Sequence, residues 1–181
     1  WLMHVPSVIG PFGDDSPKGR CPSPDWLEAM TTAREIANLE NRKFFLMPSS
    51  ALQCFDIVVQ SPGAFQNHAA MAVGRGRWFV SCYINPKFMD AEKWKFFADL
   101  ITWARHQREF LQEPVPIGGD PGKREAYGYA YRHNTRELYC LRNPWIEEAS
   151  LALPVSPMAV SPRQVRSLYP RREIITNLKI N

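Results

Sequence analysis

Apolar and polar residues change their spacing from one segment to the next, and each spacing predicts an element. Residues 23–39 place apolar side chains every three or four positions, which is typical of a helix with one buried face. Residues 78–84 form a nearly continuous apolar run that predicts a buried strand. From residue 91 to about 112 the helical spacing returns over a wide apolar face, and Asp90 stands where a helix N-cap is expected.

Short strands are predicted around these helices. Residues 5–9, 43–48 and 57–59 are apolar runs, and turn-forming or polar residues lie beside them. The alternation of strand and helix favours an α/β fold. The apolar face of the helix at 91–112 is so wide that we expect it to be covered from two sides.

The second half of the chain has the two-residue period of β-strands. Residues 114–122 hold several prolines and glycines, so no regular structure is expected there and a domain boundary is placed near residue 113. Three tyrosines then alternate with small residues over 127–131, at the start of a hairpin predicted for residues 126–142. We expect these tyrosines to pack against the preceding helix, with a carbohydrate-binding platform as the alternative.

Composition narrows the class of protein. The chain has 181 residues, of which 45% are hydrophobic and 12% aromatic, and this excludes a disordered chain. The net charge of +4 is scattered apart from four arginines between 163 and 172, so no nucleic-acid partner is expected. No apolar run approaches the roughly 20 residues of a membrane helix, so no membrane partner is expected either.

Cysteines and short motifs bear on cofactors and on the cellular compartment. Cys21, Cys54, Cys82 and Cys140 are far apart and form no CxxC pair, and the last three lie in apolar runs typical of buried free thiols. Disulfides would form only after export, so the localisation stays unknown, with a periplasmic or secreted protein as one alternative. Because no metal-ligand spacing, GxGxxG or P-loop motif occurs, neither a metal nor a cofactor is expected.

Six short motifs follow one another along the chain: Gly74-Arg75-Gly76-Arg77-Trp78, Asn85-Pro86, Trp103-Ala104-Arg105, Gly118-Gly119-Asp120-Pro121, Tyr127-Gly128-Tyr129 and Leu141-Arg142-Asn143-Pro144. In this order they resemble the C-terminal portion of α-galactosidase-like (melibiase-type) glycoside hydrolases. The resemblance implies that residues 1–112 are the C-terminal part of a (β/α)8 TIM barrel. Residues 113–181 would then form a small antiparallel β-sandwich domain.

The same resemblance implies a carbohydrate substrate and hydrolysis of its O-glycosidic bonds. Retaining enzymes of this kind use two carboxyl groups about 5–5.5 Å apart. Neither family carboxylate matches a position in this sequence, so the pair is expected mostly upstream of the fragment, which would be inactive alone. Because the chain opens at Trp1 within a strand-like run, the remaining N-terminal part of its own chain is an expected partner. A non-catalytic carbohydrate-binding or structural module is the alternative.

The loop at residues 10–24 supplies the candidate catalytic residues. Asp14 and Asp15 follow a predicted strand, and either carboxylate would bond sugar hydroxyls or act as an acid. Adjacent side chains in an extended segment point apart, so the two do not make a catalytic pair, and a solvated turn is the alternative. Lys18 and Arg20 would bind a hydroxyl or a carboxylated sugar, unless they form a surface ion pair.

Five more residues are candidates for substrate binding. His4 lies in the first predicted strand, where a structural histidine is the alternative. Asn67 and His68 stand in a predicted loop and offer hydrogen bonds to a polyhydroxylated ligand, with helix capping by Asn67 as the alternative. Tyr83 and Asn85 close a predicted strand, where an aromatic ring and an amide suit a sugar subsite.

Overall fold

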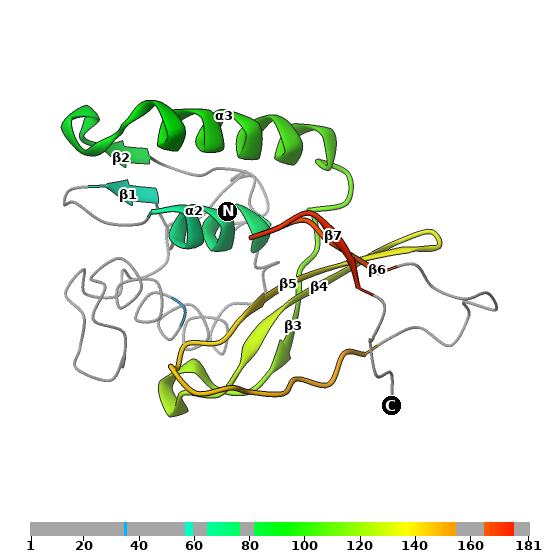
Figure 1. Cartoon of the computed structure of the whole chain (residues 1–181). Coiled ribbons are helices and arrows are strands. Elements are labelled where there is room, and N and C mark those ends of the chain that lie inside the picture. Colours follow the sequence, from blue (N-terminus) through cyan, green and yellow to red (C-terminus); the bar gives the residue numbers. More distant parts are fainter. Residues whose placement is uncertain (1–34, 36–56, 60–64, 77–81, 155–164, 176–181) are drawn as a thin grey trace, which may run out of the picture.

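The computed structural model describes residue 35 and residues 57–59, 65–76, 82–154 and 165–175 (Figure 1). Its elements in chain order are β1 (Ile57–Val59), α2 (Gln66–Gly74), β2 (Cys82–Ile84), a 3-10 turn (Pro86–Phe88), α3 (Ala91–His106), β3 (Val115–Gly118), a second 3-10 turn (Pro121–Lys123), β4 (Tyr127–His133), β5 (Arg136–Arg142), β6 (Val165–Ser167) and β7 (Glu173–Ile175). Glu35 is also helical.

β1 and β2 form a parallel pair, and α2 lies between them in the chain. Ile57 is opposite Cys82, and Val59 is opposite Ile84. The Asn85 backbone N–H extends the pairing by donating to the Val59 carbonyl oxygen at 2.9 Å. The predicted strand at 57–59 is confirmed, and the predicted strand at 78–84 is confirmed over its last three residues.

β3, β4 and β5 form an antiparallel sheet in that spatial order. The β4–β5 hairpin confirms the prediction for residues 126–142, and its turn holds Asn134 at a φ of 53°, a left-handed conformation that asparagine tolerates. The prediction that residues 114–122 lack regular structure is wrong, because β3 includes Pro116. Among the described strands β3 lies at the edge of its sheet, where a residue without a backbone N–H is tolerated.

Two apolar clusters make up the described core, and α3 packs against both. Ile57, Val59 and Phe65 belong to the first cluster, between the parallel pair and the helices. Met71 and the three tyrosines of β4 belong to the second. Trp103 and Ala104 of α3 contact both clusters, so α3 links the parallel pair to the antiparallel sheet.

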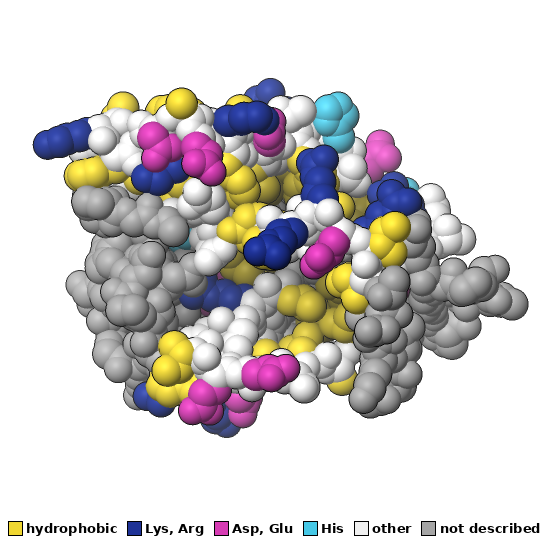
Figure 2. Space-filling view, viewed as in Figure 1, with side chains coloured by type: hydrophobic (Ala, Val, Ile, Leu, Met, Phe, Trp, Pro, Cys, Tyr) yellow, Lys and Arg dark blue, Asp and Glu magenta, His cyan; other side chains and the backbone are white. Residues whose placement is uncertain are grey.

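α3 begins where the sequence predicts but ends earlier than predicted. Asp90 caps its N-terminus as expected, since the carboxylate accepts a hydrogen bond from the Lys93 backbone N–H at 2.8 Å. The helix ends at His106 rather than near 112, and Phe110 and Leu111 turn into the second cluster. The expected cover from two sides is wrong, because no residue of α3 is buried and its outer surface carries charged side chains of both signs (Figure 2).

The fold-class prediction is wrong as well. The described residues contain two complete α-helices and mostly antiparallel strands, with parallel pairing confined to β1 and β2, whereas a (β/α)8 barrel fragment would repeat parallel strands. The described residues do not form the predicted β-sandwich either, since the tyrosine face of β4 packs against residues of α2 and α3. The division at residue 112/113 stays a prediction. No helix in the described ranges combines the length and apolar character needed to cross a bilayer.

Candidate functional site

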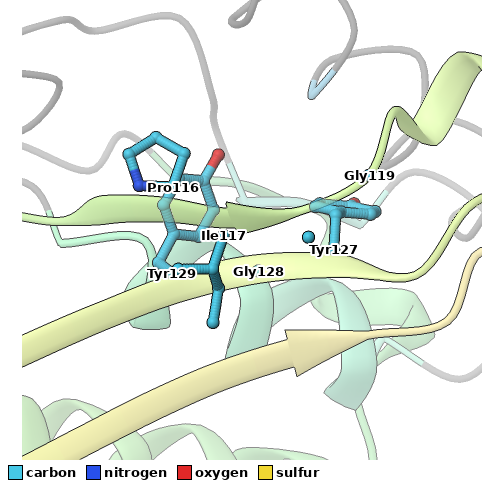
Figure 3. Close-up of a pocket in the computed structure, with 7 residues that line it drawn as sticks. Pro116, Ile117, Gly119, Tyr127, Gly128 and Tyr129 are labelled. Atoms are coloured by element: carbon cyan, nitrogen blue, oxygen red, sulfur yellow. The ribbon is translucent and has the colours of Figure 1, made fainter. Parts of the chain in front are cut away.

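A pocket of about 110 Å³ lies against β3 and β4, and we call it the β3–β4 pocket (Figure 3). β3 and the residue after it supply one side, and three consecutive residues of β4 supply the other. The lining residues are Pro116, Ile117, Gly118, Gly119, Tyr127, Gly128 and Tyr129. Two aromatic rings and a run of exposed backbone therefore meet in one hollow.

Strand register explains why these residues meet. Pro116 is opposite Tyr129, and Gly118 is opposite Tyr127, so the two tyrosine rings follow one face of the sheet beside small or compact partners. Gly118 has a φ of 84°, which side chains with a Cβ rarely adopt. A Cβ on Gly128 would collide with the carbonyl oxygen of Cys140 on β5. Glycine is thus required by close backbone approach, and it leaves the hollow open.

Two charged residues are buried in the described interior, and one of them bonds a tyrosine that lines the pocket. Glu35 and Arg75 are both 0% exposed. The Tyr129 hydroxyl donates a hydrogen bond to the Glu35 carboxylate, which joins β4 to a residue 94 positions earlier in the chain. The tyrosine that forms a pocket wall is therefore anchored at its far end by a buried acid.

Burial and these charges decide the protonation of the tyrosines. Burial raises the pKa of Tyr129 well above its ordinary range, the negative charge of Glu35 adds to the rise, and the Arg75 guanidinium opposes it. Burial likewise raises the pKa of Tyr131, with the same opposing effect of Arg75. Both hydroxyls therefore remain protonated at neutral pH and act as hydrogen-bond donors.

The end of α2 is joined to the same strand. The Tyr131 hydroxyl donates to the Gly74 carbonyl oxygen at 2.8 Å, immediately before Arg75. The Cys140 sulfur lies 3.7 Å from the Met71 sulfur, one turn earlier on α2. Burial, together with the Glu35 charge, raises the pKa of the Cys140 thiol to about 12. This part of the interior combines polar and apolar contacts between α2 and the sheet.

A tight loop forms the rim of the pocket next to Gly119. The Asp120 backbone N–H donates to the Glu125 carboxylate at 2.7 Å, and the Asp120 carboxylate accepts from Gly122 N–H at 2.7 Å. The Arg124 guanidinium lies over the Trp145 ring, 3.8 Å from its centroid. The rim therefore carries two carboxylates on a loop braced by its own hydrogen bonds.

Two predicted ligand residues lie on α2 rather than in a loop. Asn67 and His68 belong to the first turn of the helix, and the N-cap residue is Phe65, with no side-chain capping bond. The loop prediction and the capping alternative for Asn67 are both wrong. The Asn67 amide oxygen accepts a hydrogen bond from the Tyr169 hydroxyl, while His68 is 0% exposed.

The other two described candidates lie at the end of β2. Tyr83 is 58% exposed. Asn85 caps the following 3-10 turn, because its side-chain oxygen accepts from Lys87 N–H at 3.1 Å. Neither residue, nor Asn67 or His68, lines the β3–β4 pocket. The predicted His4, Asp14, Asp15, Lys18 and Arg20 lie outside the described residues.

Sequence reasoning missed Glu35 and Arg75. Glu35 stands between alanines at 33 and 37 that were assigned to the buried face of a helix, so the pattern gives it to the solvent side. The sequence does contain one signal for buried polar partners, the row of tyrosines at 127–131, because a buried phenol hydroxyl needs a hydrogen-bond partner. The row predicts that partners exist, but it does not identify them.

No three His, Cys, Asp or Glu side chains within the described part of the chain gather in a way that suits a metal ion. Family models, curated proteins and solved structures give no match to this chain.

Proposed function

We propose that this chain binds a saccharide in the β3–β4 pocket. The observation that carries the proposal is the meeting of two tyrosine rings with the backbone of Gly118 and Gly119 in one hollow. Sugars present apolar C–H faces that pack on aromatic rings, and hydroxyls that bond to backbone and side-chain polar groups. The pocket has both kinds of surface.

Pocket size limits what enters it. Its volume of about 110 Å³ is several times the roughly 10–15 Å³ that one water requires in the same measure. A single sugar unit or its hydroxymethyl arm suits this space better than a longer saccharide, the rest of which would extend over the rim at Asp120 and Glu125.

The resemblance to glycoside hydrolases supports the same ligand class. Two of the six motifs that carry it, Gly118-Gly119-Asp120-Pro121 and Tyr127-Gly128-Tyr129, supply five of the pocket's lining residues. The same five residues carry part of the resemblance and line the pocket, which favours a carbohydrate ligand.

Titration of the protein with a panel of monosaccharides and disaccharides tests the proposal. Tyr127→Leu should weaken binding of a saccharide by about ten-fold or more, because it removes an aromatic wall worth about 1 kcal/mol beyond its buried area. Tyr131→Leu is the matched control, since it is equally buried on the same strand but does not line the pocket. Equal weakening by both variants, or no binding to the unaltered protein, would refute this site.

Hydrolysis of O-glycosidic bonds is the second candidate function, and the rim carboxylates favour it. Asp120 and Glu125 are held by backbone hydrogen bonds beside Gly119, where a bound sugar would project. An assay with aryl α- and β-glycosides should show release of the aryl group that Asp120→Asn or Glu125→Gln abolishes. Binding without release would leave the chain as a carbohydrate-binding module.

A further inference from the structure

We infer that Glu35 and Arg75 are positioning residues, which hold the Tyr129 ring in place as a wall of the β3–β4 pocket. The inference rests on the proposed saccharide-binding function, and it assigns a role to the two buried charges that sequence reasoning missed. Neither residue lines the pocket, so they would act through Tyr129 rather than by touching a ligand.

The first support is the geometry of Tyr129. Its backbone is fixed by pairing with Pro116 on one side and Cys140 on the other. Its hydroxyl, at the far end of the side chain, donates to the Glu35 carboxylate. A side chain held at both ends has little freedom to swing about χ1, so the bond to Glu35 helps to fix the direction in which the ring extends from β4.

The second support is the charge balance. A carboxylate that is 0% exposed is costly to bury without partners, and here Glu35 accepts the Tyr129 hydrogen bond while an equally buried guanidinium, that of Arg75, is available to balance its charge. The Glu35 charge adds to the raised pKa of both Tyr129 and Tyr131, and the Arg75 charge opposes it, so both charges act on the two phenols. Two buried opposite charges are weak evidence for stability. We therefore assign them a more specific role, which is to fix the position of Tyr129 beside the pocket.

The third support is the attachment of Arg75. It directly follows Gly74, whose carbonyl oxygen accepts the hydrogen bond of the Tyr131 hydroxyl. The C-terminal end of α2 is thereby fixed to β4 two residues from Tyr129. The backbone just before Arg75 is consequently attached to the strand that carries Tyr129.

Tyr131 supplies a matched control inside the same strand. Tyr129 and Tyr131 are each 1% exposed, and each donates one buried hydrogen bond to a distant part of the chain. They differ in that Tyr129 lines the pocket and Tyr131 does not. A purely structural role of the hydroxyls predicts the same consequence for both.

The experiment compares Glu35→Ala, Glu35→Gln and Tyr131→Phe in the full chain. Tyrosine labelled with ¹³C at Cζ reports the environment of each hydroxyl by NMR, and titration with the best saccharide of the panel reports affinity. We expect Glu35→Ala to move the Tyr129 signal and to weaken binding about ten-fold, as for loss of a buried charged hydrogen bond. Glu35→Gln keeps an acceptor and should retain most of the affinity, while Tyr131→Phe should leave affinity unchanged.

The outcomes separate this inference from the proposed function. If saccharide binds and Glu35→Ala leaves affinity unchanged, or if all three variants weaken it in proportion to their loss of thermal stability, positioning is refuted and binding stands. If no saccharide binds, the proposed function fails, and the NMR signal of Tyr129 alone decides whether Glu35 positions the ring. A signal that moves in Glu35→Ala but not in Tyr131→Phe then upholds positioning of the ring, and an unmoved signal overturns it.

Discussion

At the scale of single residues, the β4 tyrosines show how polar groups are accommodated in this interior. Tyr129 bonds the Glu35 carboxylate, and Tyr131 bonds the Gly74 carbonyl oxygen. An unmade hydrogen bond at such a depth costs about 1–3 kcal/mol, so both hydroxyls need the partners they have. Alternation of tyrosine with small residues was visible in the sequence, whereas the partners come from elsewhere in the chain.

Cys140 should be unreactive in the folded protein. Its thiol has a pKa raised to about 12, so almost none is thiolate at pH 8, and the thiolate is the nucleophile. Alkylation by iodoacetamide at pH 8, followed by peptide mapping, should therefore modify exposed Cys82 and leave Cys140 unmodified until denaturant is added. Modification of both at comparable rates in the native protein would contradict the raised pKa of the Cys140 thiol.

At the scale of elements, close backbone contact decides which glycines are essential. Gly128→Ala should destabilise the protein by roughly 1–3 kcal/mol, because the new Cβ meets the Cys140 backbone and neither strand can move away alone. Gly119→Ala is the comparison, since its Cβ would meet the Cβ and the carboxylate of Glu125 in an exposed loop, which can shift at a smaller cost than two paired strands. Urea unfolding measures both, and equal losses would show that strand contact is not the cause.

Phe65, the N-cap residue of α2, packs against α3. It is 0% exposed, and its ring lies 6.0 Å from that of Phe96 and 6.1 Å from that of Phe97, edge to face. Phe65→Ala should cost about 3–5 kcal/mol in the free energy of unfolding, whereas Tyr83→Ala, at an exposed site, should cost no more than about 1 kcal/mol. Chemical denaturation compares the two, and a small loss for Phe65→Ala would mean that the helices are held by other contacts.

At the scale of the whole molecule, the buried phenols make stability depend on alkaline pH. The pKa values of Tyr129 and Tyr131 are raised in the folded state, while the unfolded chain loses these protons above about pH 10. The unfolded state then binds fewer protons, so stability is complete below about pH 10 and falls as pH rises beyond it, by about 1.4 kcal/mol per pH unit for each tyrosine.

Unfolding by urea between about pH 9 and pH 11.5 measures this slope. Tyr131→Phe removes one of the two titrating groups, so its stability should fall less steeply than that of the unaltered protein, even though the variant starts from a lower value. An identical slope in the variant would show that Tyr131 does not contribute to it.

Local features were predictable because neighbouring residues determine them. The β4–β5 hairpin and β1 follow from strand-like patterning of their own residues, and the Asp90 cap follows from its place before an amphipathic stretch. Two local predictions failed for local reasons too: Pro116 is tolerated because its strand lies at an edge, and α3 ends early because Phe110 and Leu111 enter the core.

By itself, the sequence determined β1, the end of the strand that contains β2, the β4–β5 hairpin and the Asp90 cap, and that the β4 tyrosines are core residues. Only the tertiary structure decided that the described strands make a three-stranded antiparallel sheet, a short parallel pair and an antiparallel β6–β7 pair, and that Glu35 meets Tyr129 across 94 positions of the chain. Hydrophobic periodicity reports which face of an element is apolar, not which element covers it. A pocket between strands and a buried bond from Tyr129 to Glu35 arise from that second choice, so they appear only when the chain is folded.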